Sequence, residues 1–253
     1  MIDKDNLIET GKRKGIKNKG FIEKDYFQDL FLFNLYKKTN NFVFKGGTAL
    51  YKLNKLPRFS EDLDFSLVEN IEINEMREMI ERASENCGFK LRSIKKTKES
   101  LMIKIDCPGL ITKHNSLRID IHTKNEIISG FDVVNHVSEY VDIPPFVLRV
   151  LKMKEIVAEK IHSLLNRRKA RDLFDLFYLL RSTNLNDKLI NKKLALFNLK
   201  YDLKLIEKKI NELEELWKPE LEAFVLTELP DFEVVKNFIL MKLKAKRNNL
   251  YKE

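Results

Sequence analysis

The spacing of apolar residues changes about halfway along the chain. Up to about residue 145, short apolar runs that suit β-strands alternate with stretches of helical spacing, as in an α+β domain. After the pair Pro144–Pro145, nearly all apolar residues recur at helical spacing. We therefore predict an α+β fold over residues 1–145, followed by an α-helical bundle over residues 146–253.

The same periodicities predict individual elements. We expect strands at 42–44, 63–67, 100–107 and 116–123, with edge strands at 133–140 and 146–150. We expect helices at 21–38, 73–86, 151–167, 170–182, 186–196, 204–216 and 233–248, and a further helix that begins within 48–53. Residues 1–20 are polar and basic, and they form either a loose arm or a short helix.

A doubled glycine and a spaced pair of aspartates follow the first predicted strand. Asp62 and Asp64 lie at the start of an apolar run and, because side chains alternate along a strand, they face the same way. Two carboxylates on one face repel each other unless a cation lies between them, and Mg²⁺ or Mn²⁺ suits oxygen ligands. Gly46 and Gly47 let backbone N–H groups approach a phosphate at the start of a helix.

The string Lys45-Gly-Gly-Thr-Ala-Leu50, followed by Arg58-Phe-Ser-Glu-Asp-Leu-Asp-Phe65, resembles the first motif of the DNA polymerase β-like nucleotidyltransferases. It is most similar to their AbiEii/AbiGii toxin branch. The resemblance implies a small mixed sheet and Mg²⁺-dependent transfer of a nucleoside monophosphate from an NTP. In that reading Asp62 and Asp64 hold the metal, and the triphosphate is bound by Gly46, Gly47, Thr48, Arg58 and Ser60.

A third carboxylate is expected from a neighbouring strand, by resemblance to the same superfamily. Asp120, the one acid in the apolar strand Leu117–His122, is the better candidate, and Asp106 is its rival. The third acid is expected to bind metal and to assist the attacking hydroxyl.

Two helices of the second half carry further candidates. Lys160 lies inside the apolar arc of its helix, so it either snorkels or meets an anion, and we expect Lys160→Met to be tolerated. Glu155 and Lys160 fit the Glu-x-x-x-x-Lys motif of the toxin branch, which implies that Lys160 contacts nucleotide phosphates. Arg171 and Asp175 fit its Arg-x-x-x-Asp motif and are assigned to the active site, although an exposed ion pair explains them too. The role of Asp172 stays open.

Composition narrows the class of partner. Lys and Arg exceed Asp and Glu by 47 to 38, a net charge of +9 that favours a polyanion such as RNA. The densest basic runs, Lys12–Lys14 and Arg167–Lys169, are the expected RNA contacts. The four histidines are scattered, and we expect them to be structural or solvated. Two cysteines without paired spacing, no signal peptide and no spanning apolar run predict a cytoplasmic protein.

By resemblance, the acceptor is the 3′ end of a tRNA and the partner is an antitoxin protein, so the chain is expected to be the toxin of a toxin–antitoxin or phage-defence pair. Two alternatives stay open. The chain could transfer a phosphoryl or nucleotidyl group to a protein or a small molecule. It could also be an inactive module that binds nucleic acid or a partner.

Overall fold

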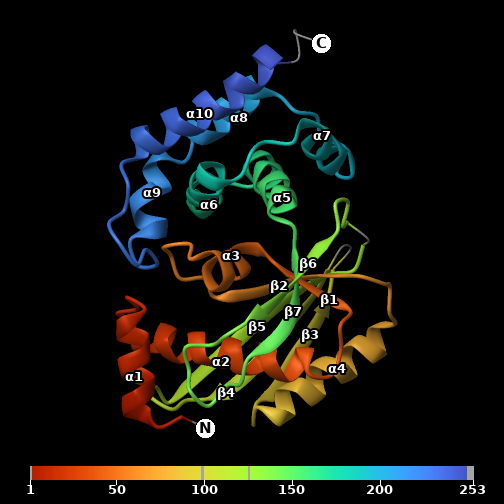
Figure 1. The fold of residues 1–253 in the computed structure, drawn as a ribbon, viewed down its shortest axis with the longest axis vertical. Helices are drawn as coiled ribbons and strands as arrows, with labels where there is room; N and C mark the ends of the chain where they lie inside the picture. Colours follow the sequence, from red (N-terminus) through yellow and green to blue (C-terminus); the bar gives the residue numbers. More distant parts are fainter. Residues whose placement is uncertain (1, 98–99, 125, 250–253) are drawn as a thin grey trace. The chain divides into compact units, whose positions relative to one another are not determined.

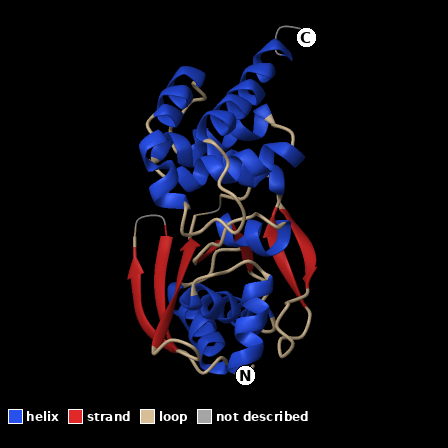
Figure 2. Cartoon of the chain, turned by 90° about the vertical axis from the view of Figure 1, so that its left-hand side faces the viewer, coloured by secondary structure: helices blue, strands red, loops and turns tan. Residues whose placement is uncertain are grey.

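The computed structural model describes residues 2–97, 100–124 and 126–249 (Figure 1). The chain divides into two compact units, one made of Met1–Ile127 with Phe131–Leu151 and the other of Ile128–Gly130 with Lys152–Glu253. Within the described residues all sheet strands (red in Figure 2) belong to the first unit, and the second unit is helical. The predicted α+β fold class is therefore confirmed. The division falls after residue 151 and not after 145, because the strand over Phe146–Leu151 belongs to the sheet.

The strands of the described residues form one seven-stranded mixed sheet in the order β3-β4-β5-β2-β1-β7-β6. The β1–β7 and β2–β5 pairs are parallel, and the other pairs are antiparallel. The strand predicted at 146–150 was expected at an edge of the sheet, but β7 lies inside it, between β1 and β6. Strand β3 was not predicted. The strands are β1 (Phe42–Lys45), β2 (Asp62–Leu67), β3 (Lys90–Lys96), β4 (Ser100–Pro108), β5 (His114–His122), β6 (Phe131–His136) and β7 (Phe146–Leu151).

Most helices lie where apolar spacing predicts them. The first unit contains α1 (Lys4–Arg13), α2 (Lys19–Tyr36), α3 (Gly46–Asn54) and α4 (Ile73–Asn86). The second unit contains α5 (Met153–Asn166), α6 (Ala170–Ser182), α7 (Asp187–Ala195), α8 (Leu203–Asn211), α9 (Glu214–Leu221) and α10 (Phe232–Asn249). The single helix predicted at 204–216 is wrong: α8 ends at Asn211 and α9 begins at Glu214. Buried Ile210, Leu213 and Trp217 keep helical spacing across the junction, which hides the break in the sequence.

One face of the sheet supplies the core of the first unit. Leu63 and Phe65 of β2 are fully buried, as are Ile103 of β4 and Ile119 of β5. Helices α2 and α4 pack beneath this face, where Figure 2 shows helices lying between the strands. Each such side chain contributes about 1.5–3 kcal/mol of burial free energy. Because strand residues alternate, the residues between these positions point to the opposite, polar face.

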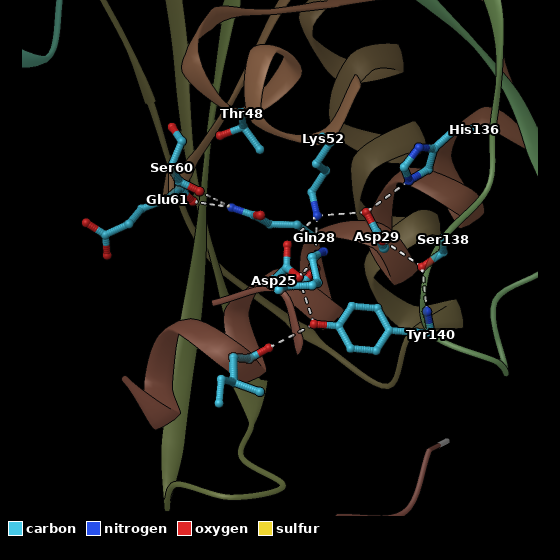
Figure 3. Close-up of polar contacts among 12 residues, drawn as sticks. Asp25, Gln28, Asp29, Thr48, Lys52, Ser60, Glu61, His136, Ser138 and Tyr140 are labelled. Atoms are coloured by element: carbon cyan, nitrogen blue, oxygen red, sulfur yellow. Dashed lines mark hydrogen bonds and ion pairs between the residues drawn. The ribbon is translucent and has the colours of Figure 1, made fainter. Parts of the chain in front are cut away.

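A buried ion cluster joins α3 to α2 (Figure 3). The Lys52 ammonium of α3 lies 2.8 Å from Asp25 Oδ1 and 2.7 Å from Asp29 Oδ1, both on α2. The Tyr140 hydroxyl donates to Asp25 at 2.7 Å, and the Ser138 hydroxyl donates to Asp29 at the same distance. The helix that begins at the double glycine is therefore held at its far end by two buried carboxylates.

Burial favours the neutral form of these acids, but their partners favour the charged form. Desolvation acts to raise the pKa of Asp25 and Asp29, but the Lys52 charge together with the other partners of each acid outweighs it, so both pKa values lie below the ordinary range. Lys14 also pairs with Asp25 and acts in the same direction. A carboxyl with a lowered folded-state pKa adds stability above its unfolded pKa and loses it as pH falls through the folded value.

Neither cysteine of the chain is in a disulfide. Cys87 and Cys107 are free thiols in buried positions. Within the described residues, no helix combines the length and apolar character that crossing a bilayer requires.

Replacing Lys52 by Met should lower the free energy of unfolding at pH 7 by about 3–5 kcal/mol, because two buried carboxylates lose their shared cation. The loss should shrink towards pH 5, where the unpaired acids take up protons. Urea unfolding at both pH values measures it, with Lys38→Met, an exposed lysine, as the control. An unfolding free energy equal to that of the control would show that the ion cluster adds nothing to stability.

Candidate functional site

The pairing of β2 with β5 brings three carboxylates together. The two strands are parallel, and their register sets Asp64 opposite Asp120 and Asp62 opposite Arg118. Neighbouring strands lie about 4.8 Å apart, so the three acids share one small area of the polar face. Burial, followed by the charges of Asp62 and Asp120, raises the pKa of Asp64 to about 6. The three carboxylates therefore lie so close together that the simultaneous ionisation of all three is disfavoured.

The double glycine lies against this area because it lacks side chains. Gly46 has φ +75°, and a Cβ there would collide with the Asp64 carboxylate. A Cβ on Gly47 would lie 2.5 Å from Arg58 Nη2 and 2.8 Å from Ser60 Oγ. The structure thus brings Gly46, Gly47, Arg58 and Ser60 together with the aspartates, as their roles in the motif require.

Two side chains hold the backbone that leads into β2. The Thr48 hydroxyl is fully buried and donates to the Asp62 carbonyl. The Gln28 side-chain amide donates to the carbonyls of Ser60 and Glu61, at 2.9 Å each (Figure 3). In this structure the Thr48 hydroxyl therefore fixes Asp62. Gln28 belongs to no motif and was not found from the sequence.

The structure distinguishes the two candidates for the third acid. Asp106 lies opposite Ser116, four residues along β4 from Met102, the residue that faces Asp120. Four residues span about 13 Å of strand, and Asp106 forms an ion pair with Arg92 at 2.7 Å. Asp120, and not Asp106, is therefore the acid beside Asp64.

The donor set suits a divalent cation. Within the described residues, no group of three or more His, Cys, Asp or Glu side chains is already arranged to hold a metal ion. However, the Asp120 Oδ1 atom is buried without a hydrogen-bond partner among those residues, while its Oδ2 atom pairs with Arg118 at 2.8 Å. A cation would satisfy that oxygen and relieve the repulsion that raises the pKa of Asp64. Carboxylates are ligands for Mg²⁺ and Mn²⁺ alike, so these residues fit either ion.

Three neighbours of the acids were missed from the sequence. Lys45 lies opposite Asp64 on β1, and its ammonium is 3.8 Å from Glu126 Oε2. His122 Nδ1 lies 3.2 Å from the same Glu126 oxygen. The positive charges of His122 and Lys45 act to lower the pKa of Asp64. Strand alternation from Asp120 would have found His122, which we expected to be structural or solvated.

Lys160 of α5 is held by two buried carboxylates of α6. Its ammonium lies 3.0 Å from Asp172 Oδ1 and 2.6 Å from Asp175 Oδ2, and both acids are fully buried. Arg167 donates to Asp172 through two nitrogens, at 2.7 and 2.9 Å. Burial acts to raise the pKa of Asp172, but the Lys160 and Arg167 charges hold it well below the ordinary range. Asp175 is thus not part of an exposed pair, and Arg171 is half-buried.

Glu155, the other residue of the Glu-x-x-x-x-Lys pattern, anchors a short segment within the second unit. Its carboxylate accepts hydrogen bonds from Ile128 N at 2.8 Å and from Ser129 N at 2.7 Å. It also pairs with the buried Lys193 at 3.1 Å. Glu155 is fully buried, and these contacts give it a structural role.

The RNA contacts expected at the two basic runs stay a prediction. Most side chains of the two basic runs are held by contacts within their own unit, which sequence spacing cannot show. Lys14 pairs with Asp25, Arg167 with Asp172 and Lys169 with Glu220 at 3.3 Å, while Arg168 donates to the Glu212 carbonyl at 2.8 Å.

Replacing Asp64 by Asn should stabilise the cation-free protein at pH 8 by about 1–2 kcal/mol and change little at pH 4.5. The native state holds a proton on Asp64 up to about pH 6, above the ordinary 3.8, so wild-type stability falls as pH rises through that window. Urea unfolding in EDTA at both pH values tests this. An equal effect at the two pH values would exclude charge repulsion as its cause.

The expected tolerance of Lys160→Met is also corrected. Removing the ammonium leaves Asp172 and Asp175 buried without their shared cation, so the free energy of unfolding at pH 7 should fall by about 3–5 kcal/mol. The matched control is Lys154→Met, an exposed lysine of the same helix. Chemical unfolding measures both variants, and a stability at or above wild type would restore the original expectation.

The fold of the chain is similar to that of solved structures. The fold matches the nucleotidyltransferase toxin MenT4 from Mycobacterium tuberculosis, with a TM-score of 0.64 and 16% identity, over 93% of this chain and 87% of that one. It also matches a candidate nucleotidyltransferase from H. pylori, with a TM-score of 0.60 and 21% identity, over 93% and 98% of the two chains. JHP933 from Helicobacter pylori matches with a TM-score of 0.51 and 22% identity, over 94% and 98%.

A search of curated proteins finds no match. Residues 29–237, most of the chain, match the family described as nucleotidyl transferase AbiEii toxin, type IV toxin–antitoxin system. The resemblance inferred from the glycine and aspartate motifs is thereby confirmed, and the chain belongs to the AbiEii family of nucleotidyltransferase toxins.

Proposed function

We propose that this nucleotidyltransferase transfers a nucleoside monophosphate from an NTP to an RNA, with the 3′ end of tRNA as the first candidate acceptor. The reaction depends on Mg²⁺, with Mn²⁺ as the alternative, and a cognate antitoxin restrains it in a cytoplasmic setting. The observation that carries the proposal is the set of crowded carboxylates Asp62, Asp64 and Asp120 directly beside the double-glycine turn. The toxin family to which the chain belongs supports the antitoxin partner.

The acids divide into two roles. Asp62 and Asp64 would hold the cation, and Asp120 would accept the proton of the acceptor hydroxyl. When bound, the cation would polarise the phosphates and offset their negative charge. The acceptor oxygen bonds to the α-phosphorus, the bond from that phosphorus to the α,β-bridging oxygen breaks, and pyrophosphate leaves.

The turn before α3 suits the triphosphate. Helix α3 begins at Gly46, so its positive end and first N–H groups are available to an anion. Arg58 Nη2 and Ser60 Oγ lie where a side chain on Gly47 would be, so they supply polar groups beside the turn. We assign the triphosphate to Gly46, Gly47, Arg58, Ser60 and the backbone N–H of Thr48. Lys160, Arg171 and Asp175 stay predictions from the sequence motifs.

Asp62→Asn and Asp64→Asn should each reduce nucleotidyl transfer by at least about a hundredfold while the protein stays folded, because Asn keeps the size but removes the charge. The assay incubates wild type and variants with each labelled NTP, Mg²⁺ and total RNA. Asp106→Asn is the matched control, since Asp106 lies on the same sheet but pairs with Arg92. Near-normal transfer by the folded Asp64 variant would remove the acid cluster from the mechanism.

The same assay separates the alternatives. Label on RNA supports the proposal, and label on protein or on a small molecule identifies a different acceptor. Transfer to nothing, by folded wild-type protein, would favour a module that binds nucleic acid or a partner without catalysis. A phosphoryl transfer would be recognised because γ-labelled NTP, and not α-labelled NTP, marks the product.

A further inference from the structure

The strands β3, β4 and β5 leave one of their faces open. Along β4, Leu101, Ile103 and Ile105 are fully buried, whereas the intervening Lys104 is exposed and Met102 is half-buried. Strand β5 repeats this alternation, and β3 is exposed or half-buried along its whole length. A sheet face that is polar and uncovered beside a set of acids is available to a ligand.

The strand register continues this open face directly from the acid cluster. Asp120 lies opposite Met102, and Met102 lies opposite Lys95 of β3. In the adjacent row, Asp62 lies opposite Arg118, which lies opposite Lys104. At about 4.8 Å per strand, Lys95 and Lys104 each lie about 10 Å across the sheet from the acid at the start of their row.

The side chains on the open face carry a surplus of positive charge. Lys95 and Lys104 are exposed, and so is Lys90, which lies opposite Asp106. The Asp106 charge is already matched by Arg92 at 2.7 Å. The face therefore presents three exposed lysines beyond the pairs formed by Arg92 and Arg118.

The chemistry of this face favours a phosphate backbone over a folded protein. Between the lysines the exposed surface is formed by Ser93 and the half-buried Ser100 and Met102, which offer little of the apolar area found at protein interface cores. Lysines are long point charges that suit phosphates without reading a base sequence. A distance of about 10 Å corresponds to roughly three base steps of rise along a nucleic-acid helix axis.

We propose that the open face of β3, β4 and β5, defined by Lys90, Lys95 and Lys104, binds the phosphate backbone of the nucleic-acid acceptor while the acceptor's end reaches the acid cluster. This inference rests on the proposed function, because it assigns a surface to the acceptor of that reaction. It offers an alternative to RNA binding by the basic runs at 12–14 and 167–169, since most charges of those runs are matched by contacts within their own unit.

The test compares two full-length variants with the same change in charge. One carries Lys90→Gln, Lys95→Gln and Lys104→Gln, and the control carries Lys4→Gln, Lys17→Gln and Lys19→Gln, three exposed lysines in and around α1 and the start of α2. Fluorescence anisotropy measures binding of a labelled single-stranded RNA and of tRNA, without NTP, at several salt concentrations. Thermal unfolding checks that both variants are folded.

The open-face variant should bind RNA at least about tenfold more weakly at 0.1 M salt, and its salt slope on the single strand should fall by about 2, since each of the three lost phosphate contacts accounts for about 0.7. The control should stay within about twofold of wild type. A DNA of the same sequence that shows the same loss supports recognition of the phosphate backbone. Equal affinity of the two variants overturns the proposal, and so does competition by poly-glutamate as strong as that by RNA.

Failure of the proposed function has a different signature. In that case folded wild-type protein would transfer no label to RNA under any condition. The contrast in RNA binding between the two variants is measured without transfer, so it holds or fails independently.

Discussion

The first unit is organised around a mutual repulsion. The β2–β5 register confines Asp62, Asp64 and Asp120 to one small area, where burial, followed by the charges of Asp62 and Asp120, raises the pKa of Asp64 to about 6. Two neighbouring groups partly offset this rise in pKa, since His122 and Lys45 both favour the ionised form of Asp64. Like charges concentrated in this way lower stability, and such clusters are typical of functional sites.

Hydrogen bonds and ion pairs within the first unit hold these repelling groups in place. The Thr48 hydroxyl and the Gln28 amide fix the backbone from Ser60 to Asp62, so the acids cannot relax by shifting the strand. Lys52 fixes the far end of α3 through two buried carboxylates of α2. The double glycine and the aspartates come from different elements, and these contacts bind both elements to the same helix. Helix α2 therefore supports the site although it contributes no residue to the chemistry.

The sequence predicted those parts of the molecule whose signal is local. Apolar spacing located α4 and α6 at their observed bounds, and the glycine and aspartate strings identified the acids and the family. Strand β3 was missed because it is exposed on both faces and rich in lysine, so it lacks a strand's apolar alternation. Gln28, Lys52 and the partners of Lys160 act through contacts between distant elements, for which single-sequence spacing carries no signal. The same limit applies to the basic runs, since the ion pairs of Lys14 with Asp25 and of Lys169 with Glu220 join different elements.

The central claim is that the crowded carboxylates form a cation site, and direct measurement of cation binding tests it most closely. Mn²⁺ can be titrated into the NTP-free protein and followed by the loss of the free-ion signal in electron paramagnetic resonance. Wild type and Asp106→Asn should bind Mn²⁺, Asp64→Asn should lose binding, and wild-type affinity should weaken below about pH 6 as Asp64 takes up its proton. Binding by Asp64→Asn that equals wild type, with no dependence on pH, would contradict the account.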